Sequence, residues 1–256
     1  MRVLSLFSGI GGLDLGLRGA VPTAHTVAYC ERNPYCVEVL KARMADGRLD
    51  TAPVYDDVRR DWTDLAGHVD AVVGGFPCQD TSTAGDRAGI VAGNRSGLFF
   101  ELARAIRDSG ARFCFLENVA AIVVRGLDIV LGELDAIGFD AEWGCLRASD
   151  VGAQHQRDRW FCFAWRSVPY SDGARLPRPE QDNGLPVGER AAHAVRGHGT
   201  IVERLALDGD RRGLRSPDGV SVTMERKRLA ALGNSCVPAQ AAEAFRLLIQ
   251  RSGVTP

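Results

Sequence analysis

The stretch Arg2–Gly16, "RVLSLFSGIGGLDLG", contains the change of pattern that decides the fold. Its beginning, "RVLSLF", is rich in branched and aromatic side chains and predicts a strand. A serine and a glycine interrupt this run, and the apolar residues Leu13, Leu17 and Ala20 then recur at the spacing of a helix face. The sequence therefore predicts a strand, a glycine turn and a helix, which is the repeating unit of an α/β sheet.

The same alternation continues as far as Trp165. One helix has a clear start, with Asn33 as its N-cap and Pro34 in its first turn. Strands that alternate with helices in this way are typical of a doubly wound, mostly parallel, Rossmann-like sheet. The expected strands are 2–7, 25–30, 54–58, 69–73, 112–119, 140–149 and 159–166, and the expected helices are 11–20, 33–44, 97–110 and 126–139.

The pattern changes after Arg166, where proline, glycine and charged residues dominate as far as Ser221. The chain then recovers a short helix, a Gly-Asn-Ser turn and a last helix that starts at Pro238. We expect this last helix to pack back on the first part of the chain. The sequence thus predicts one main domain, residues 1–165 and 222–256, interrupted by a small irregular segment, residues 166–221.

Composition narrows the class of protein. The 256 residues are 45% apolar and 25% charged, with a net charge of −1, as in an ordinary globular chain. Seven cysteines without a C-x-x-C pair argue against disulfides and a thiolate zinc site, and favour a reducing cytoplasm. The histidines show no ligand spacing, so we expect no metal. No apolar stretch is long enough to span a bilayer, and the N-terminus lacks the features of a signal peptide.

Groups suited to binding a ligand follow three successive strands. The glycines of the first turn, Gly9, Gly11 and Gly12, allow the backbone to approach a ligand closely. The strict dinucleotide fingerprint fails, because Asp14 stands where its third glycine should be. Two acidic residues compensate for this, since Glu31 closes the second strand and Asp57 lies at the end of the third. Together they favour a cofactor that contains a nucleoside, with Asp56 as the alternative to Asp57.

A cysteine stands at an unusual place in "GGFPCQDTSTAG", residues 74–85. The buried strand Val69–Val73 precedes it, and we expect the two glycines to turn the chain there. Cys78 would then lie beside the cofactor site, where a thiolate of lowered pKa can act as a nucleophile. Glu117 ends the next strand and should project over the same edge. Other cysteines, such as Cys114 and Cys162 within apolar strands, are expected to be core residues, and Arg157 and Arg159 are expected on one face of an extended chain.

These motifs together resemble the DNA (cytosine-5)-methyltransferases. "FSGIGGLDLG" is similar to the first motif of that family, "GGFPCQDTS" to its catalytic Pro-Cys-Gln motif and "ENV" to its glutamate motif. "QRDR" is similar to the arginine motif, and "ALGNSCVPAQ" to the last one. The motifs occur in the family's order and cover residues 1–165 and 224–250.

The resemblance implies that the cofactor is S-adenosylmethionine. By motif position, Phe7 would stack on the adenine, Glu31 would bind the ribose and Asp57 would accept from the adenine amino group. The remaining cofactor contacts would come from Gly9, Gly11, Gly12, Pro77, Leu98 and Asn234.

The resemblance also gives each catalytic residue a task. Addition of the Cys78 thiolate to C6 of cytosine makes C5 nucleophilic. Glu117 would stabilise charge on the ring near N3, Arg159 would hold O2 and Arg157 would brace the site. Because C6 cannot be reached inside a duplex, the base must be flipped out of double-stranded DNA. Ser82 and Arg95 match family positions that touch the DNA backbone.

The segment 166–221 corresponds to the target-recognition region of the family but is short. Its basic residues, including Arg211, Arg212 and Arg215, fit phosphate contacts, which carry no sequence information. We therefore expect a short or degenerate target site, or a specificity partner. A cognate restriction enzyme is a further expected partner, for a monomer in the cytoplasm of a prokaryote or a phage-infected host. Two alternatives remain, a tRNA cytosine-5 methyltransferase and a catalytically silent DNA-binding protein with this fold.

Overall fold

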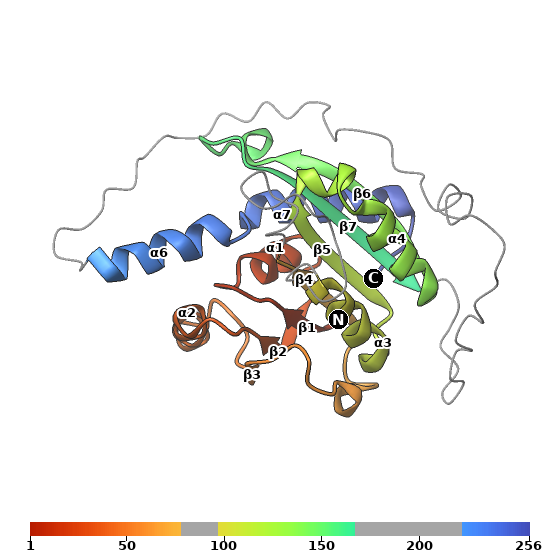
Figure 1. Ribbon diagram of the computed structural model, residues 1–256, viewed down its shortest axis with the longest axis horizontal. Coiled ribbons are helices and arrows are strands. Elements are labelled where there is room, and N and C mark those ends of the chain that lie inside the picture. The colour runs from red at the N-terminus through yellow and green to blue at the C-terminus, as the bar shows by residue number, and fades with distance from the viewer. Residues whose placement is uncertain (78–96, 167–221) are drawn as a thin grey trace.

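The computed structural model describes residues 1–77, 97–166 and 222–256, and this part of the chain forms one seven-stranded sheet (Figure 1). The strand order is β3-β2-β1-β4-β5-β7-β6. β1 to β5 run parallel, and β7 is antiparallel to both of its neighbours. The predicted doubly wound, mostly parallel sheet is confirmed. The strands are β1 Arg2–Leu6, β2 His25–Cys30, β3 Val54–Tyr55, β4 Ala71–Gly75, β5 Phe113–Val119, β6 Phe139–Arg147 and β7 Asp158–Arg166.

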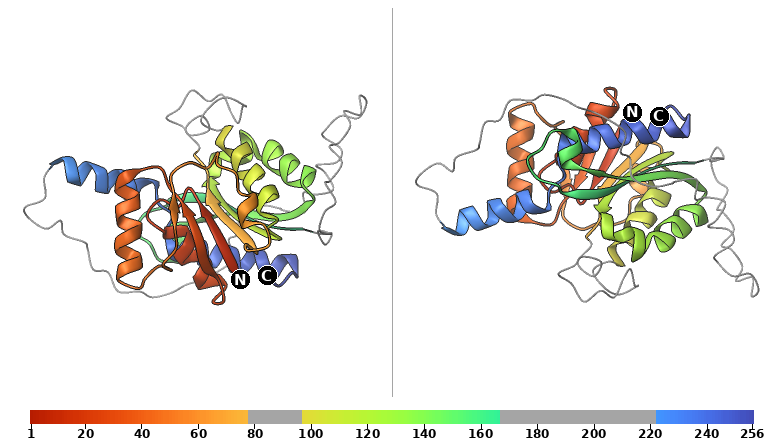
Figure 2. Two further views of the ribbon diagram at one scale, coloured as in Figure 1. Left: turned by 90° about the horizontal axis from the view of Figure 1, so that it is seen from below. Right: turned by 90° about the horizontal axis from the view of Figure 1, so that it is seen from above.

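Helices cover both faces of the sheet (Figure 2). α1 and α7 pack on one face, and α3 and α4 pack on the other. α6 extends away from the sheet, as both figures show. The helices are α1 Gly12–Ala20, α2 Pro34–Ala45, α3 Leu98–Ser109, α4 Leu127–Ala136, α6 Val222–Asn234 and α7 Pro238–Ser252, and the short 3₁₀ turns are η1 Thr63–Leu65, η3 Ala120–Val124 and η4 Ala148–Val151.

Local signals set the helix ends where the sequence predicted them. The Asn33 side chain accepts a hydrogen bond from the Tyr35 backbone N–H at 3.0 Å, so the predicted N-cap of α2 is confirmed. α3 ends at Gly110, whose φ of 68° is the left-handed conformation that glycine adopts readily. These residues need no tertiary contacts to specify the helix ends, which is why the sequence alone locates them.

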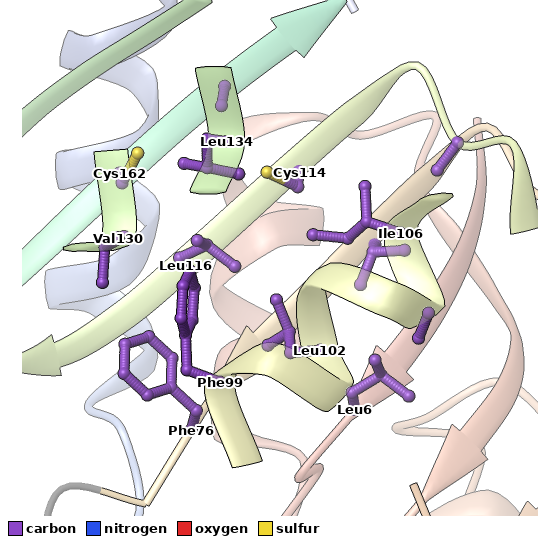
Figure 3. Close-up of a cluster of buried hydrophobic side chains, with 14 of the residues drawn as sticks. Leu6, Phe76, Phe99, Leu102, Ile106, Cys114, Leu116, Val130, Leu134 and Cys162 are labelled. Carbon is purple, nitrogen blue, oxygen red and sulfur yellow. The ribbon is translucent and has the colours of Figure 1, made fainter. Parts of the chain in front are cut away.

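The face covered by α3 and α4 holds the larger apolar core (Figure 3). The rings of Phe76 and Phe99 lie 4.9 Å apart between their centroids, and both residues are buried. Cys114 and Cys162 are also buried, as expected of core residues. This packing fixes α3 against the end of β4, the strand that leads into the Pro-Cys segment.

The other face is closed by α7, which packs back on α1 as expected. Small residues allow this close approach: a Cβ added at Gly16 would lie 2.5 Å from the Ala241 Cβ and 3.0 Å from the Pro238 carbonyl oxygen. The last helix therefore holds the first glycine turn in place, although more than two hundred residues separate them in the sequence.

We predict that Gly16→Ala lowers the free energy of unfolding by about 1–3 kcal/mol, because the new methyl group overpacks the α1–α7 contact. Gly132→Ala is the matched control, since a Cβ at this position in α4 would meet nothing within 4 Å. It should stabilise the helix by up to about 1 kcal/mol. Denaturant unfolding of both variants measures the difference, and equal stability of Gly16→Ala and the wild type would contradict the packing role.

Two expected turns are wrong. Gly74 and Gly75 do not turn the chain but are the last residues of β4, paired in register with Leu116 and Glu117 of β5. Gly74 is needed for close packing, since a Cβ there would lie 2.8 Å from the Leu102 side chain. The Gly-Asn-Ser turn is wrong in its position, because α6 continues through Asn234 and the chain bends only at Ser235.

Candidate active site

The candidate site lies at the carboxyl edge of the parallel strands. The strand order reverses beside β1, since β1 pairs with β2 on one side and with β4 on the other. In open α/β sheets, ligands bind outside the carboxyl ends of strands at such a switch point. The glycine turn after β1 and the Phe76–Pro77 segment after β4 therefore begin on neighbouring strands at this edge.

The residues of the glycine turn play different parts. Phe7 and Gly9 have φ angles of 54° and 55°, so the chain turns sharply as it leaves β1. A Cβ at Gly9 would meet nothing within 4 Å, which leaves open space beside the backbone. At Gly11 an added Cβ would lie 2.5 Å from Leu49, and at Gly12 the same distance from the Cys236 carbonyl oxygen. Gly11 and Gly12 are thus packing positions, and Gly9 is the one of the three that faces space.

Glu31 ties two loops together. Its Oε2 accepts from the Gly9 N–H at 2.7 Å, and its Oε1 accepts from the Asn33 N–H at 2.7 Å. A carboxylate has about four lone-pair sites, so each oxygen keeps one for a further donor. The residue is only half-buried. Glu31 therefore shapes the glycine turn and can also bind a ligand hydroxyl.

Asp57 lies just beyond β3, with its carboxylate exposed. Its Oδ1 accepts from the Arg59 N–H at 2.9 Å and faces the Arg59 guanidinium at 3.8 Å. The side chain is 56% exposed, so it remains open to a ligand. Asp56 is exposed as well.

Asp14, which breaks the dinucleotide fingerprint, is a buried structural residue. Its carboxylate accepts from the Ser5 hydroxyl at 3.0 Å and the Thr26 hydroxyl at 3.1 Å, which joins α1 to β1 and β2. Burial raises the pKa of Asp14 to about 6, and the two hydroxyl donors oppose this rise. Its role is to hold the helix on the sheet.

Glu117 and Arg159 form a buried ion pair at the same edge. In the antiparallel pairing of β5 with β7, Arg159 lies opposite Val119, so it is a diagonal neighbour of Glu117 on the same face of the sheet. The Arg159 Nε lies 2.9 Å from the Glu117 Oε1, and the side chains are 18% and 12% exposed. Burial raises the pKa of Glu117 above its ordinary value, while Arg159 and Arg157 oppose the rise.

The residues around this pair leave little freedom. A Cβ at Gly75 would lie 2.9 Å from the Glu117 Oε2, so glycine there makes room for the carboxylate. The Asn118 side-chain amide donates to the Phe76 carbonyl oxygen at 3.2 Å. The chain entering the Pro-Cys segment is thereby fixed to the strand that carries Glu117.

The prediction that Arg157 and Arg159 lie on one face of an extended strand is wrong for Arg157. Arg157 precedes β7 and has a φ of 34°, so the alternation rule does not apply to it. Its guanidinium donates to the carbonyl oxygens of Gly233, at 2.8 Å, and Ser235. The Arg157 carbonyl accepts from the Gln240 side chain at 2.8 Å. Arg157 thus joins the arginine motif to the turn between α6 and α7.

The other predicted residues lie around this edge or outside the described ranges. Leu98 starts α3 and is half-buried against the core, Pro77 is half-buried after β4, and Asn234 is exposed at the end of α6 between the two carbonyls that Arg157 binds. The predicted residues outside the described ranges are Cys78, Ser82, Arg95, Arg211, Arg212 and Arg215.

Within residues 1–77, 97–166 and 222–256, no group of three or more histidine, cysteine, aspartate or glutamate residues could hold a metal ion. No helix in these ranges has the length and apolar character needed to span a membrane.

Solved structures with this fold define the class of protein. A DNMT2 variant from Spodoptera frugiperda superposes with a TM-score of 0.52 at 21% identity, covering 72% of this chain and 55% of its own. A DNA modification methyltransferase encoded within an E. coli prophage gives 0.51 at 24% identity, covering 65% and 47%. At these identities the likeness is one of fold. The chain therefore shares the Rossmann-like sheet of these methyltransferases.

Sequence comparison narrows this class to one family. The model of the C-5 cytosine-specific DNA methylases matches residues 1–195. The type II methyltransferase M.CviJI of Paramecium bursaria Chlorella virus IL3A is 38% identical over 167 residues, which are 64% of this chain and 43% of the relative. M1.ScrFI of Lactococcus lactis subsp. cremoris is 30% identical over 217 residues, 82% of this chain and 53% of the relative. The chain belongs to the C-5 cytosine-specific DNA methylase family, and it spans about half the length of these relatives.

Proposed function

We propose that this protein transfers a methyl group from S-adenosylmethionine to C5 of a cytosine flipped out of double-stranded DNA. The observation that carries the proposal is the buried Glu117–Arg159 pair at the switch-point edge, next to the strand that leads into Pro77 and Cys78. The pKa of Glu117 is raised, so its carboxyl can hold a proton and donate it in a hydrogen bond to N3 of a cytosine. The neighbouring Arg159 guanidinium can donate to O2 of the same base.

The residues at the edge fit the cofactor. Gly9 leaves open space, Glu31 keeps free lone pairs for ribose hydroxyls, and the exposed Asp57 carboxylate can accept from an adenine amino group. Phe7 lies half-buried next to the turn and offers a ring for stacking. When bound, S-adenosylmethionine supplies the electrophilic methyl group.

The reaction on the base then depends on the chain's own residues. The Cys78 thiolate adds to C6 of cytosine, and Glu117 donates a hydrogen bond to N3 as electron density moves into the ring. Arg159 binds O2 and keeps Glu117 in place. Transfer of the methyl group to C5 leaves S-adenosylhomocysteine as the other product. A base then takes the C5 proton, and the thiolate leaves from C6 as the ring double bond re-forms.

The remaining parts of the proposal concern domains and partners. Residues 1–165 and 222–256 form the catalytic domain, and residues 166–221 contact the target DNA with few base contacts. We infer a cytoplasmic monomer of a prokaryote or an infected host. Its relatives are type II methyltransferases of bacteria and a virus, which supports a cognate restriction enzyme or a specificity partner.

The experiment offers purified protein and labelled S-adenosylmethionine a randomised DNA duplex and, separately, a tRNA pool. Bisulfite sequencing then locates 5-methylcytosine. Label in DNA at a short or degenerate site supports the proposal. Label only in tRNA would show that tRNA is the substrate. DNA binding without any methyl transfer would identify a catalytically silent DNA-binding protein.

We predict that Glu31→Ala weakens binding of S-adenosylhomocysteine by about 1–3 kcal/mol, because a partly buried, hydrogen-bonded carboxylate is lost. Glu31→Gln should bind nearly as weakly. In the wild type the two carboxylate oxygens accept from the Gly9 and Asn33 backbone N–H groups, and in the glutamine variant an NH₂ donor would face one of these two donors. Glu38→Gln is the control, because Glu38 is an exposed residue of α2 that pairs with Lys41. Calorimetry showing wild-type affinity in folded Glu31→Ala would refute the assignment.

A further inference from the structure

Arg104, in the middle of α3, donates four side-chain hydrogen bonds. Its Nε donates to Glu101 at 2.9 Å and its Nη1 to Asp108 at 2.9 Å. Its Nη2 leaves the helix and donates to the carbonyl oxygens of Val58 at 3.2 Å and Arg60 at 3.0 Å. The side chain is 27% exposed. The two carboxylates orient the guanidinium so that its free edge binds another loop.

That loop follows β3 and carries Asp57. The Val58 carbonyl that Arg104 binds also accepts from the Trp62 indole N–H at 2.9 Å, and Trp62 is fully buried. On the outer side, the Arg60 guanidinium lies over the Tyr55 ring, 4.1 Å from its centroid. The backbone on the carboxyl side of Asp57 is therefore fixed by α3 and by the loop's own aromatic residues.

The position of α3 gives this contact a meaning beyond stability. α3 begins at Leu98, immediately after the segment that contains Cys78, and Arg104 lies on it less than two turns later. Ion pairs between neighbouring residues of one helix contribute only weakly to stability. Two hydrogen bonds to the carbonyls of a distant loop, by contrast, determine where that loop lies relative to the helix. Functional side chains keep their geometry only if supporting residues of this kind hold them.

We propose that Arg104 is a positioning residue that sets the place of Asp57 and thereby the affinity for the adenine end of the cofactor. The inference rests on the proposed function, in which Asp57 accepts from the adenine amino group. Arg104 contacts neither cofactor nor base and acts only through the Val58–Arg60 backbone. It follows that its loss should alter cofactor binding and leave the reaction at saturating cofactor nearly unchanged.

The test measures S-adenosylhomocysteine affinity by calorimetry and methyl transfer with S-adenosylmethionine. Arg104→Met should weaken binding and raise KM for the cofactor about tenfold, while kcat changes less than about twofold. Arg104→Lys keeps the charge but loses the planar guanidinium with its several N–H donors, so its loss of S-adenosylhomocysteine affinity should be smaller. This variant replaces Arg104→Met in the test if the methionine variant does not fold. Arg107→Met is the matched control, because Arg107 lies on the same helix, pairs with the same Asp108 and should leave affinity unchanged.

A double-variant cycle separates positioning from general destabilisation. If Arg104 acts through Asp57, the Asp57→Ala/Arg104→Met protein binds S-adenosylhomocysteine no more weakly than Asp57→Ala alone. Additive losses, or unchanged affinity in folded Arg104→Met and Arg104→Lys, would overturn the inference while leaving the proposed function in place. Failure of the wild type itself to bind S-adenosylhomocysteine would overturn the proposed cofactor, and this inference with it.

Discussion

Replacing Cys78 by alanine is expected to lower the rate of methyl transfer to DNA by at least about a thousandfold, the scale of loss seen when a catalytic nucleophile is removed. The physical reason is that C5 of cytosine is a poor nucleophile until a thiolate has added at C6. Binding of S-adenosylhomocysteine should stay within about twofold of wild type, because Glu31 and Asp57 remain unchanged. Single-turnover transfer and calorimetry measure the two quantities separately.

Cys145→Ala is the control for this variant. Cys145 lies half-buried in β6, where burial raises the pKa of its thiol to about 11, so it stays protonated and unreactive. The Cys145→Ala variant should therefore transfer methyl groups at the wild-type rate. Retention of more than a few per cent of activity by Cys78→Ala would show that another group adds to the base.

The second large effect is expected at Arg159. Arg159→Met leaves the Glu117 carboxylate buried without the partner that lies 2.9 Å away, and breaking a buried pair in this way costs about 3–5 kcal/mol. Methyl transfer should also fall by about a hundredfold or more, since O2 of the base loses its donor. Chemical denaturation and transfer kinetics test both parts.

The loss of stability should depend on pH in a defined direction. Arg159 opposes the rise that burial causes in the pKa of Glu117, so its removal raises that pKa further. The folded variant then holds a proton that the unfolded chain releases, and its stability falls as pH rises toward the folded pKa. The loss of stability of Arg159→Met relative to the wild type should be small in acid and reach its full size above the folded-state pKa of Glu117. The double variant Glu117→Gln/Arg159→Met should recover stability and lose this dependence, whereas an undiminished deficit in it would contradict the ion-pair account.

The parts of the site that the sequence predicted are those fixed by strand ends. Glu31 follows β2 directly, Asp57 lies two residues beyond β3 and Glu117 lies near the end of β5, and parallel strands bring their carboxyl ends to one edge whatever the loops do. The resemblance of the motifs supplied their roles. The contact between Glu117 and Arg159, however, depends on the antiparallel register of β5 with β7, which no local pattern specifies.

Other features could not be predicted, because they depend on contacts between distant residues. Arg157 reaches Gly233 through a left-handed backbone conformation, which breaks the alternation expected of a strand. Arg104 stands at the spacing of ordinary ion pairs with Glu101 and Asp108, so a sequence pattern indicates only a solvated helix face. The two glycines after Val73 indicated a turn, yet they extend β4 because close neighbours exclude a side chain there.

The central claim, covalent catalysis by Cys78 on a flipped cytosine, is tested most directly with duplex DNA that contains 5-fluorocytosine. Fluorine cannot leave C5 as a proton does, so the account predicts that the enzyme and S-adenosylmethionine form a stable covalent complex. Peptide mass spectrometry should find the methylated base attached to the peptide that contains Cys78, and Cys78→Ala should form no complex. An adduct that persists in Cys78→Ala, or one attached to another residue, would contradict the account.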